Sequence, residues 1–158
     1  MLNISERTSS LGTETAFAIL KEVNDLVSQG RNVVNFCIGQ PDFDTPEYIK
    51  NGAIKAIHDG RTGYTASAGI PELREAAAKY LSRTRHLNIN PDSVVIGNGA
   101  KPFIGYSILS ATDPGKGHEV LYPNPGFPIY ESLIRAYGAV PVPLPLIERK
   151  EYCFDLEE

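Results

Sequence analysis

The fold of this sequence is decided by the stretch Val94-Val95-Ile96-Gly97-Asn98-Gly99-Ala100-Lys101-Pro102-Phe103. Its β-branched start favours a strand, and the small residues that follow favour a tight turn leading into a helix. The same alternation continues along the chain, with strands expected at 93–96, 119–122 and 140–142 and helices at 101–111 and 128–137. Strands separated by helices imply right-handed crossovers and largely parallel pairing, so we expect an α/β fold beginning near residue 45.

Upstream of this stretch, residues 1–12 are polar and without periodicity, which predicts an extended arm. A helix is expected over about 14–29, because Thr13 can cap it, Gly30 can end it, and one stripe carries Phe17, Leu20, Asn24 and Val27. Residues 33–38 are β-rich and predict a strand that ends in the turn-forming residues 39–43.

Two more helices are expected between that strand and residue 90. The first follows Thr45-Pro46 and has an apolar face formed by Ile49, Ala53, Ile54 and Ile57. The second opens at Gly69-Ile70-Pro71-Glu72, and its shared face is formed by Leu73, Ala76, Ala77, Tyr80 and Leu81. Near the end of the chain, prolines alternate with apolar residues over 140–145. Because proline donates no ladder hydrogen bond, this predicts a strand that lies at the edge of the sheet or is already leaving it.

Composition excludes several classes of protein. The chain has 158 residues, of which 42% are hydrophobic and 22% charged, as expected for a soluble globular domain. Its net charge of −4 gives no basic excess for binding nucleic acid or an anionic membrane. Cys37 and Cys153 have no CxxC spacing, so neither a metal site nor a disulfide framework is expected. A signal-peptide pattern and a long apolar span are both missing, so we expect a cytoplasmic protein.

The turn at residues 97–100 gives the strongest local indication of chemistry. A strand that turns sharply into a helix leaves backbone N–H groups at the positive end of the helix dipole, where a phosphate can bind. Tight packing alone also explains such small residues. Neither familiar nucleotide pattern fits, because Lys101 is followed by proline where the Walker motif needs Ser or Thr, and GxGxxG is broken after Gly97 and Gly99.

Four segments, taken in order, resemble consecutive landmarks of the class I/II aminotransferases, fold-type-I enzymes that use pyridoxal 5′-phosphate (PLP). They are GQPDFDTP at 39–46, YTASAGIPELR at 64–74, GAK at 99–101 and PNPGFPIY at 123–130. The resemblance covers nearly the whole chain. It implies a PLP-transferase fold in which residues 1–44 supply an arm, a helix and a first strand to a small domain, while 45–158 begin the large PLP-binding domain.

The resemblance also implies roles for single residues. Gly39 would present its backbone to the substrate α-carboxylate, at a close approach that a Cβ would obstruct. Gly99, Ala100 and Lys101 would hold the cofactor phosphate, and Phe127 would stack on the pyridine ring of PLP. Read without the resemblance, Gly39 is an ordinary strand-ending turn, and Phe127 is equally compatible with a core residue.

Tyr64 matches the tyrosine that, in this family, reaches the cofactor phosphate of the neighbouring subunit. The resemblance therefore implies a homodimer with shared active sites. Residues 1–12 agree with this, because related enzymes pack such an arm on the partner subunit. The alternative is that Tyr64 is an ordinary exposed loop tyrosine.

PLP chemistry needs a Schiff-base lysine, an acid facing the pyridine nitrogen and usually an arginine for the substrate carboxylate. The family motifs that carry these groups do not occur in residues 1–158, and none of the seven lysines lies in a Schiff-base motif. Lys101 is expected beside the phosphate, where it is poorly placed to reach the aldehyde across the ring. We therefore interpret the chain as an N-terminal fragment without a catalytic residue of its own, and residues 152–158 as the entry to another helix.

Three functions are compatible with these features. The leading hypothesis is transamination between an amino acid and a 2-oxo acid, in amino acid metabolism, with this chain carrying part of the cofactor and substrate site. The second is a lyase or synthase of the same PLP superfamily. The third is a non-catalytic domain that binds a phosphate ligand or a partner chain.

Overall fold

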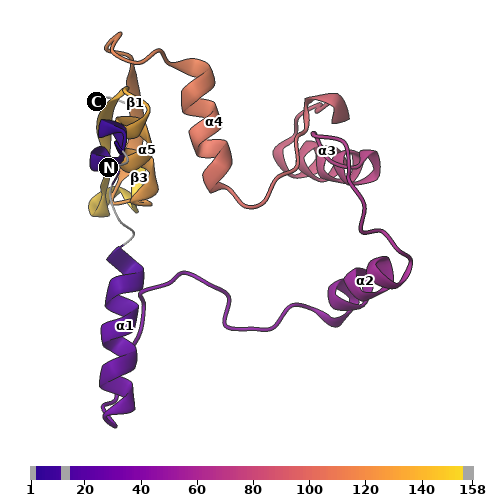
Figure 1. Cartoon of the computed structure of the whole chain (residues 1–158), viewed down its shortest axis with the longest axis horizontal. Coiled ribbons are helices and arrows are strands. Elements are labelled where there is room, and N and C mark those ends of the chain that lie inside the picture. Colours follow the sequence, from indigo (N-terminus) through magenta and orange to yellow (C-terminus); the bar gives the residue numbers. More distant parts are fainter. Residues whose placement is uncertain (1–2, 12–14, 155–158) are drawn as a thin grey trace. The chain divides into compact units, whose positions relative to one another are not determined.

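The computed structural model describes residues 3–11 and 15–154. Backbone contacts divide the chain into two compact units, one formed by residues 39–98 and the other by residues 1–38 together with 99–158. We call them the middle unit and the sheet unit (Figure 1). The division at residue 44 that the sequence suggests stays a prediction.

The middle unit contains the helices α2 (Glu47–His58) and α3 (Pro71–Arg85) and the 3-10 helix η2 (Pro91–Ser93). Proline opens α3, where its missing N–H is no loss. The helix ends at Arg85 and is followed by the C-cap residue His86, which has a left-handed φ of 54°. Ala78, on the face of α3 that meets η2, is the buried residue of this helix.

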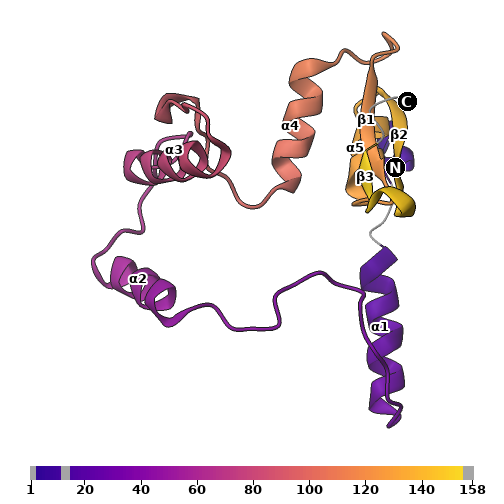
Figure 2. The ribbon, with the colours of Figure 1, turned by 180° about the vertical axis from the view of Figure 1, so that it is seen from behind.

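The sheet unit contains all three described strands. In chain order its elements are η1 (Glu6–Ser10), α1 (Thr15–Ser28), α4 (Lys101–Ala111), β1 (Glu119–Asn124), α5 (Ile129–Ala136), β2 (Val140–Ile147), η3 (Glu148–Lys150) and β3 (Cys153–Phe154). The strand order is β1-β2-β3, with β2 parallel to β1 and antiparallel to β3 (Figure 2). The parallel β1-α5-β2 unit confirms the predicted α/β class, and α4 has the bounds that the sequence predicts.

A small apolar core joins the helices α4 and α5 to the sheet. Ile108 of α4, Ile134 of α5 and Ala139 are buried together, and Val120 and Tyr122 of β1 pack against them. Because side chains alternate along a strand, Val120 and Tyr122 share the face of β1 that these helices cover. Leu121, on the opposite face, is 62% exposed.

The prolines of β2 lie where proline costs no hydrogen bond with β1. The Val140 N–H donates to the His118 carbonyl at 2.8 Å, toward the β1 side. Since N–H directions alternate along a strand, the positions of Pro141, Pro143 and Pro145 face away from β1. On that side β3 pairs only with Leu146 and Ile147, so residues 140–145 form an edge among the described residues, as the sequence predicts.

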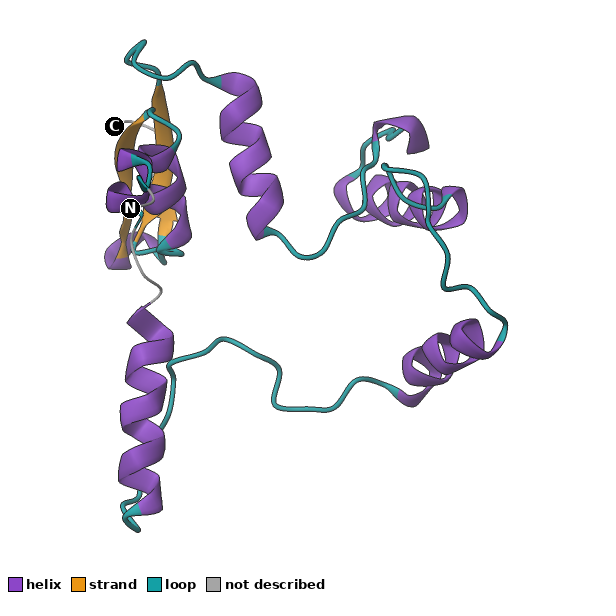
Figure 3. Ribbon diagram, viewed as in Figure 1, coloured by secondary structure: helices purple, strands orange, loops and turns teal. Residues whose placement is uncertain are grey.

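Two predicted strands do not form. Within the described part of the chain, residues 33–38 and 93–96 have no strand partner, and both are drawn mainly as loop in Figure 3. Their polar backbone groups bond elsewhere: the Cys37 N–H donates to Asn35 Oδ1 at 2.9 Å, and the Ile96 N–H donates to the Ala68 carbonyl at 2.9 Å. A local turn and a loop contact therefore replace the expected ladders.

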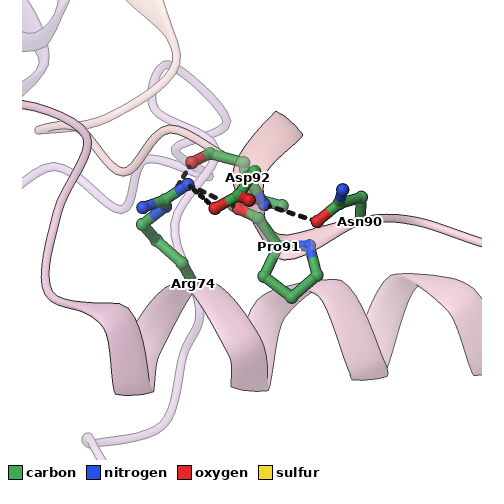
Figure 4. Close-up of polar contacts among 5 residues, drawn as sticks. Arg74, Asn90, Pro91 and Asp92 are labelled. Carbon is green, nitrogen blue, oxygen red and sulfur yellow. Dashed lines mark hydrogen bonds and ion pairs between the residues drawn. The ribbon is translucent and has the colours of Figure 1, made fainter.

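The predicted apolar faces of α2 and α3 are largely exposed in the described part of the chain. Helix α2 has no buried residue, and Leu73 and Tyr80 of α3 are exposed. The face of α3 that packs is the one with Ala78 and Arg74. Arg74 Nε donates to the Val94 carbonyl at 2.9 Å, and one of its terminal nitrogens donates to the Pro91 carbonyl at 2.9 Å (Figure 4).

Both ends of the chain differ from the sequence-based expectations. Part of the predicted extended arm forms η1, which begins after Ser5 and packs on α5. Cys153 and Phe154 form β3, so the predicted entry to a helix at 152–158 is wrong for these residues. Thr13, proposed as a helix cap, lies outside the described residues, as do residues 155–158 and the side chain of Phe17.

Candidate cofactor-binding site

The amino end of α4 presents backbone donors at the positive end of an eleven-residue helix. Gly99 precedes it with a φ of +81°, a conformation that glycine adopts without strain. Ala100 occupies the N-cap and makes no side-chain cap hydrogen bond. A helix start without a side-chain cap can offer its first N–H groups to an anion. This is where the sequence predicts the phosphate.

The loop between β1 and α5 carries Phe127. Its Asn124–Pro125 peptide bond is cis, and a Cβ on Gly126 would collide with the Pro123 carbonyl oxygen. The Phe127 carbonyl accepts from the Tyr130 N–H at 3.1 Å, and the two rings meet edge to face with centroids 5.8 Å apart. Phe127 is 37% exposed, so its ring remains partly accessible.

Lys101 and Phe127 bring these two parts of the sheet unit together. The Lys101 ammonium nitrogen lies 5.5 Å from the centroid of the Phe127 ring, within the range of a cation–π contact. One residue opens α4 and the other follows the carboxyl end of β1. The predicted phosphate turn and the predicted ring platform are therefore neighbours in the structure.

One cavity of the sheet unit is apolar, unlike the polar start of α4. It is a space of about 280 Å³ between α4, α5 and β1, and its lining includes Ile104, Tyr122, Pro123 and Tyr130. No charged side chain lines it. This apolar space therefore offers a phosphate no charged partner.

A polar cluster ties β1 to α5 beside the Phe127 loop. The Tyr122 hydroxyl donates to Glu131 Oε2 at 2.9 Å, and Arg135 donates to Glu131 Oε1 from Nε at 3.0 Å and from a terminal nitrogen at 2.8 Å. The hydrogen bond from Arg135, followed by that from Tyr122, lowers the pKa of Glu131. Burial, followed by the hydrogen bond to Glu131, raises the pKa of Tyr122.

Gly39 and Tyr64 belong to the middle unit, so no geometry relates them to Lys101 or Phe127. The Tyr64 side chain is fully exposed. A Cβ on Gly39 would meet no atom of the described residues within 4 Å, so none of these residues requires glycine there. Their predicted roles toward a substrate and a neighbouring subunit remain predictions.

Each unit has one set of polar side chains that organises it, and the sequence did not predict either set. Arg74 entered only as part of a motif, and Tyr122, Glu131 and Arg135 were not singled out. The Glu131–Arg135 spacing of four residues on a predicted helix was a usable signal. The Tyr122–Glu131 bond had no such signal, because it depends on how α5 lies against β1.

Across residues 3–11 and 15–154, no group of three or more His, Cys, Asp or Glu side chains is placed to hold a metal ion. None of the helices described is both long and apolar enough to cross a membrane.

The sequence matches the family described as aminotransferase class I and II over residues 31–158. It is 37% identical over 155 residues to a probable aspartate/prephenate aminotransferase of Aquifex aeolicus, a match that covers 98% of this chain and 39% of that protein. It is 36% identical over 154 residues to a bifunctional aspartate and glutamate/aspartate-prephenate aminotransferase of Petunia hybrida, covering 98% of this chain and 32% of that protein.

Solved structures give the same result. An aspartate aminotransferase from Thermus thermophilus with maleate matches with a TM-score of 0.90 at 32% identity, covering 99% of this chain and 41% of that chain. An alanine aminotransferase from Pyrococcus furiosus matches with a TM-score of 0.85 at 31% identity, covering 98% and 39%. The chain thus spans about two fifths of the length of most of these relatives. The family match, the sequence relatives and the structures agree, and this chain belongs to the aminotransferase class I and II family.

Proposed function

We propose that this chain supplies the phosphate-binding turn and the ring platform of a PLP site in an aminotransferase. The observation that carries the proposal is the 5.5 Å separation between the Lys101 ammonium nitrogen and the Phe127 ring. It brings a positive charge at a helix start next to a flat, partly exposed aromatic surface. PLP combines the two matching groups, a phosphate and a flat pyridine ring.

The residues present fit this cofactor. The N–H groups at the start of α4 are suited to phosphate oxygens, and the Lys101 ammonium adds charge on the same side. The exposed part of the Phe127 ring offers a π-surface on which a pyridine ring can stack. When bound, PLP would supply the electron sink that lets an amino group move between an amino acid and a 2-oxo acid.

The remaining assignments extend the proposal to substrate and subunit. Gly39 would present its backbone to the substrate carboxylate, and Tyr64 would reach the phosphate of a neighbouring subunit's cofactor in a homodimer. The full exposure of Tyr64 is compatible with such a contact. The relatives are named for aspartate, prephenate and alanine, so an amino acid and a 2-oxo acid are the proposed substrate classes.

Calorimetric binding of pyridoxine 5′-phosphate to the full chain tests the proposal. This analogue has an alcohol in place of the aldehyde, so it reports the site without condensing with lysines. The chain should bind it more tightly than either pyridoxine or inorganic phosphate, because the site takes both groups. Phe127→Leu should remove the advantage of the ring, whereas Phe154→Leu, an exposed control on β3, should retain it. Equal affinity for the analogue and for phosphate would contradict the proposal.

A further inference from the structure

The loop that carries Phe127 is closed at its base by one hydrogen bond between side chains. Tyr122 lies on β1 before the loop and Glu131 lies in the first turn of α5 after it. The Tyr122 hydroxyl donates to Glu131 Oε2 at 2.9 Å. We call this contact the Tyr122–Glu131 clasp.

Glu131 is itself held in place on α5. Arg135, one helical turn later, donates two hydrogen bonds to its other carboxylate oxygen, Oε1. The carboxylate is thereby oriented from both sides, and its negative charge is favourable in the first turn of a helix. Ile134, in the last turn of the same helix, is 1% exposed, so the carboxyl end of α5 is held against the sheet independently of the clasp.

Inside the clasp the loop has few ways to move. Gly126 approaches the Pro123 carbonyl too closely for any Cβ, and the Tyr130 N–H bonds the Phe127 carbonyl. Phe127 nevertheless lies between the two ends that the clasp joins. A change in the distance between β1 and the start of α5 would therefore move its ring relative to Lys101.

We propose that the Tyr122–Glu131 clasp is a positioning device that holds the Phe127 ring ready for a ligand ring. Tyr122 and Glu131 touch neither phosphate nor ring in this assignment and act through the loop. The inference rests on the proposed function, since it gives Phe127 the role of platform. It predicts that the clasp affects binding of the ligand ring and leaves phosphate binding at α4 unchanged.

A purely structural role makes a different prediction. A hydrogen bond that only stabilises the sheet unit would change the affinities for the analogue and for phosphate together, or change neither. Two measurements separate these cases: hydrogen exchange of the backbone amides over residues 126–130, and the ratio of affinities for pyridoxine 5′-phosphate and inorganic phosphate.

The variants are chosen to keep the fold. Tyr122→Phe removes only the hydroxyl and retains the ring that packs in the core. Glu131→Gln keeps an acceptor for Tyr122 and should partly retain the effect. Tyr106→Phe removes a hydroxyl from an exposed position on α4 and serves as the matched control.

We expect Tyr122→Phe to speed exchange of the Tyr130 amide and to weaken binding of the analogue by about three- to tenfold, as for one lost hydrogen bond, with phosphate affinity unchanged. Glu131→Gln should lie between wild type and Tyr122→Phe, and Tyr106→Phe should match wild type. Unchanged exchange of the Tyr130 amide in Tyr122→Phe, or a parallel loss of affinity for the analogue and for phosphate, would contradict the positioning role of the clasp. A wild-type chain that prefers the analogue no more than phosphate contradicts the proposed function itself, and the exchange result then decides the clasp alone.

Discussion

The Lys101 ammonium lies 5.5 Å from the centroid of the Phe127 ring, although one residue opens α4 and the other follows β1. The topology explains the contact. Helix α4 runs back to the start of β1, so its amino end lies at the carboxyl end of the strand, where ligands bind in open α/β sheets. The contact places a cation over one face of the aromatic ring that is proposed to stack on a cofactor ring.

Removing the Lys101 charge should weaken binding of phosphate-containing ligands. Because Lys101 is exposed, we expect Lys101→Met to lower the affinity for pyridoxine 5′-phosphate by only about two- to fivefold, with no loss for pyridoxine. Added salt should reduce this difference between wild type and variant. Calorimetry at two ionic strengths measures it. Lys116→Met, in the loop beyond the other end of α4, is the control, and an equal effect there would assign the loss to net charge alone.

Gly126 should not tolerate a side chain. In Gly126→Ala the new Cβ meets the Pro123 carbonyl oxygen, and relieving that overlap should cost about 1–3 kcal/mol of unfolding free energy. Gly52→Ala provides the opposite control, because this helical glycine in α2 has open space and should gain about 0.5–1 kcal/mol. Urea unfolding of both variants gives the two values. A neutral Gly126→Ala would show that the loop is looser than the structure indicates.

The Tyr122–Glu131 clasp should limit stability at both ends of the pH range. The pKa of Glu131 is lowered from its ordinary 4.5. The carboxylate therefore stabilises the folded state above pH 4.5, and this stabilisation is lost as the pH falls through the lowered pKa. The pKa of Tyr122 is raised from 10.0. The neutral hydroxyl therefore stabilises the folded state fully below pH 10.0, and this stabilisation is lost as the pH rises through the raised pKa. Unfolding free energies of wild type and Tyr122→Phe against pH measure this. The alkaline loss should be smaller in the variant, and an identical alkaline limb would refute the assignment.

Arg74 should stabilise the middle unit more than an exposed arginine does. Its side chain is 17% exposed and donates to the Pro91 and Val94 carbonyls and to the Asp92 carboxylate. Arg74→Met leaves those carbonyls without this donor, at a cost of about 1–3 kcal/mol for a buried polar group. Hydrogen exchange over residues 89–96 and thermal unfolding report the loss, and Arg83→Met, on the exposed side of α3, should change neither. Equal effects of the two substitutions would contradict the role of Arg74.

The sequence predicted those parts of the fold that depend on local pattern. Helix α4 and the parallel β1-α5-β2 unit follow from periodicity and turn residues, whereas the choice of Lys101 and Phe127 as site residues came from the family resemblance. The strands expected at 33–38 and 93–96 were wrong, because a β-rich segment becomes a strand only when another segment pairs with it. The packing face of α3 was missed since Arg74 fixes it through carbonyls distant in sequence. The roles proposed for Gly39 and Tyr64 involve a substrate and a second subunit, which local pattern does not encode.

The claim that Phe127 and the start of α4 form one site is tested most directly by an NMR titration of the full chain with pyridoxine 5′-phosphate. The predicted result is saturable shifts of the Gly99, Ala100 and Lys101 amides together with the Phe127 ring protons, at one common dissociation constant. The amides that open α3, another proline-led helix, should not shift. Shifts at both helix starts, or at the α4 amides without the Phe127 ring, would contradict a single site for phosphate and ring.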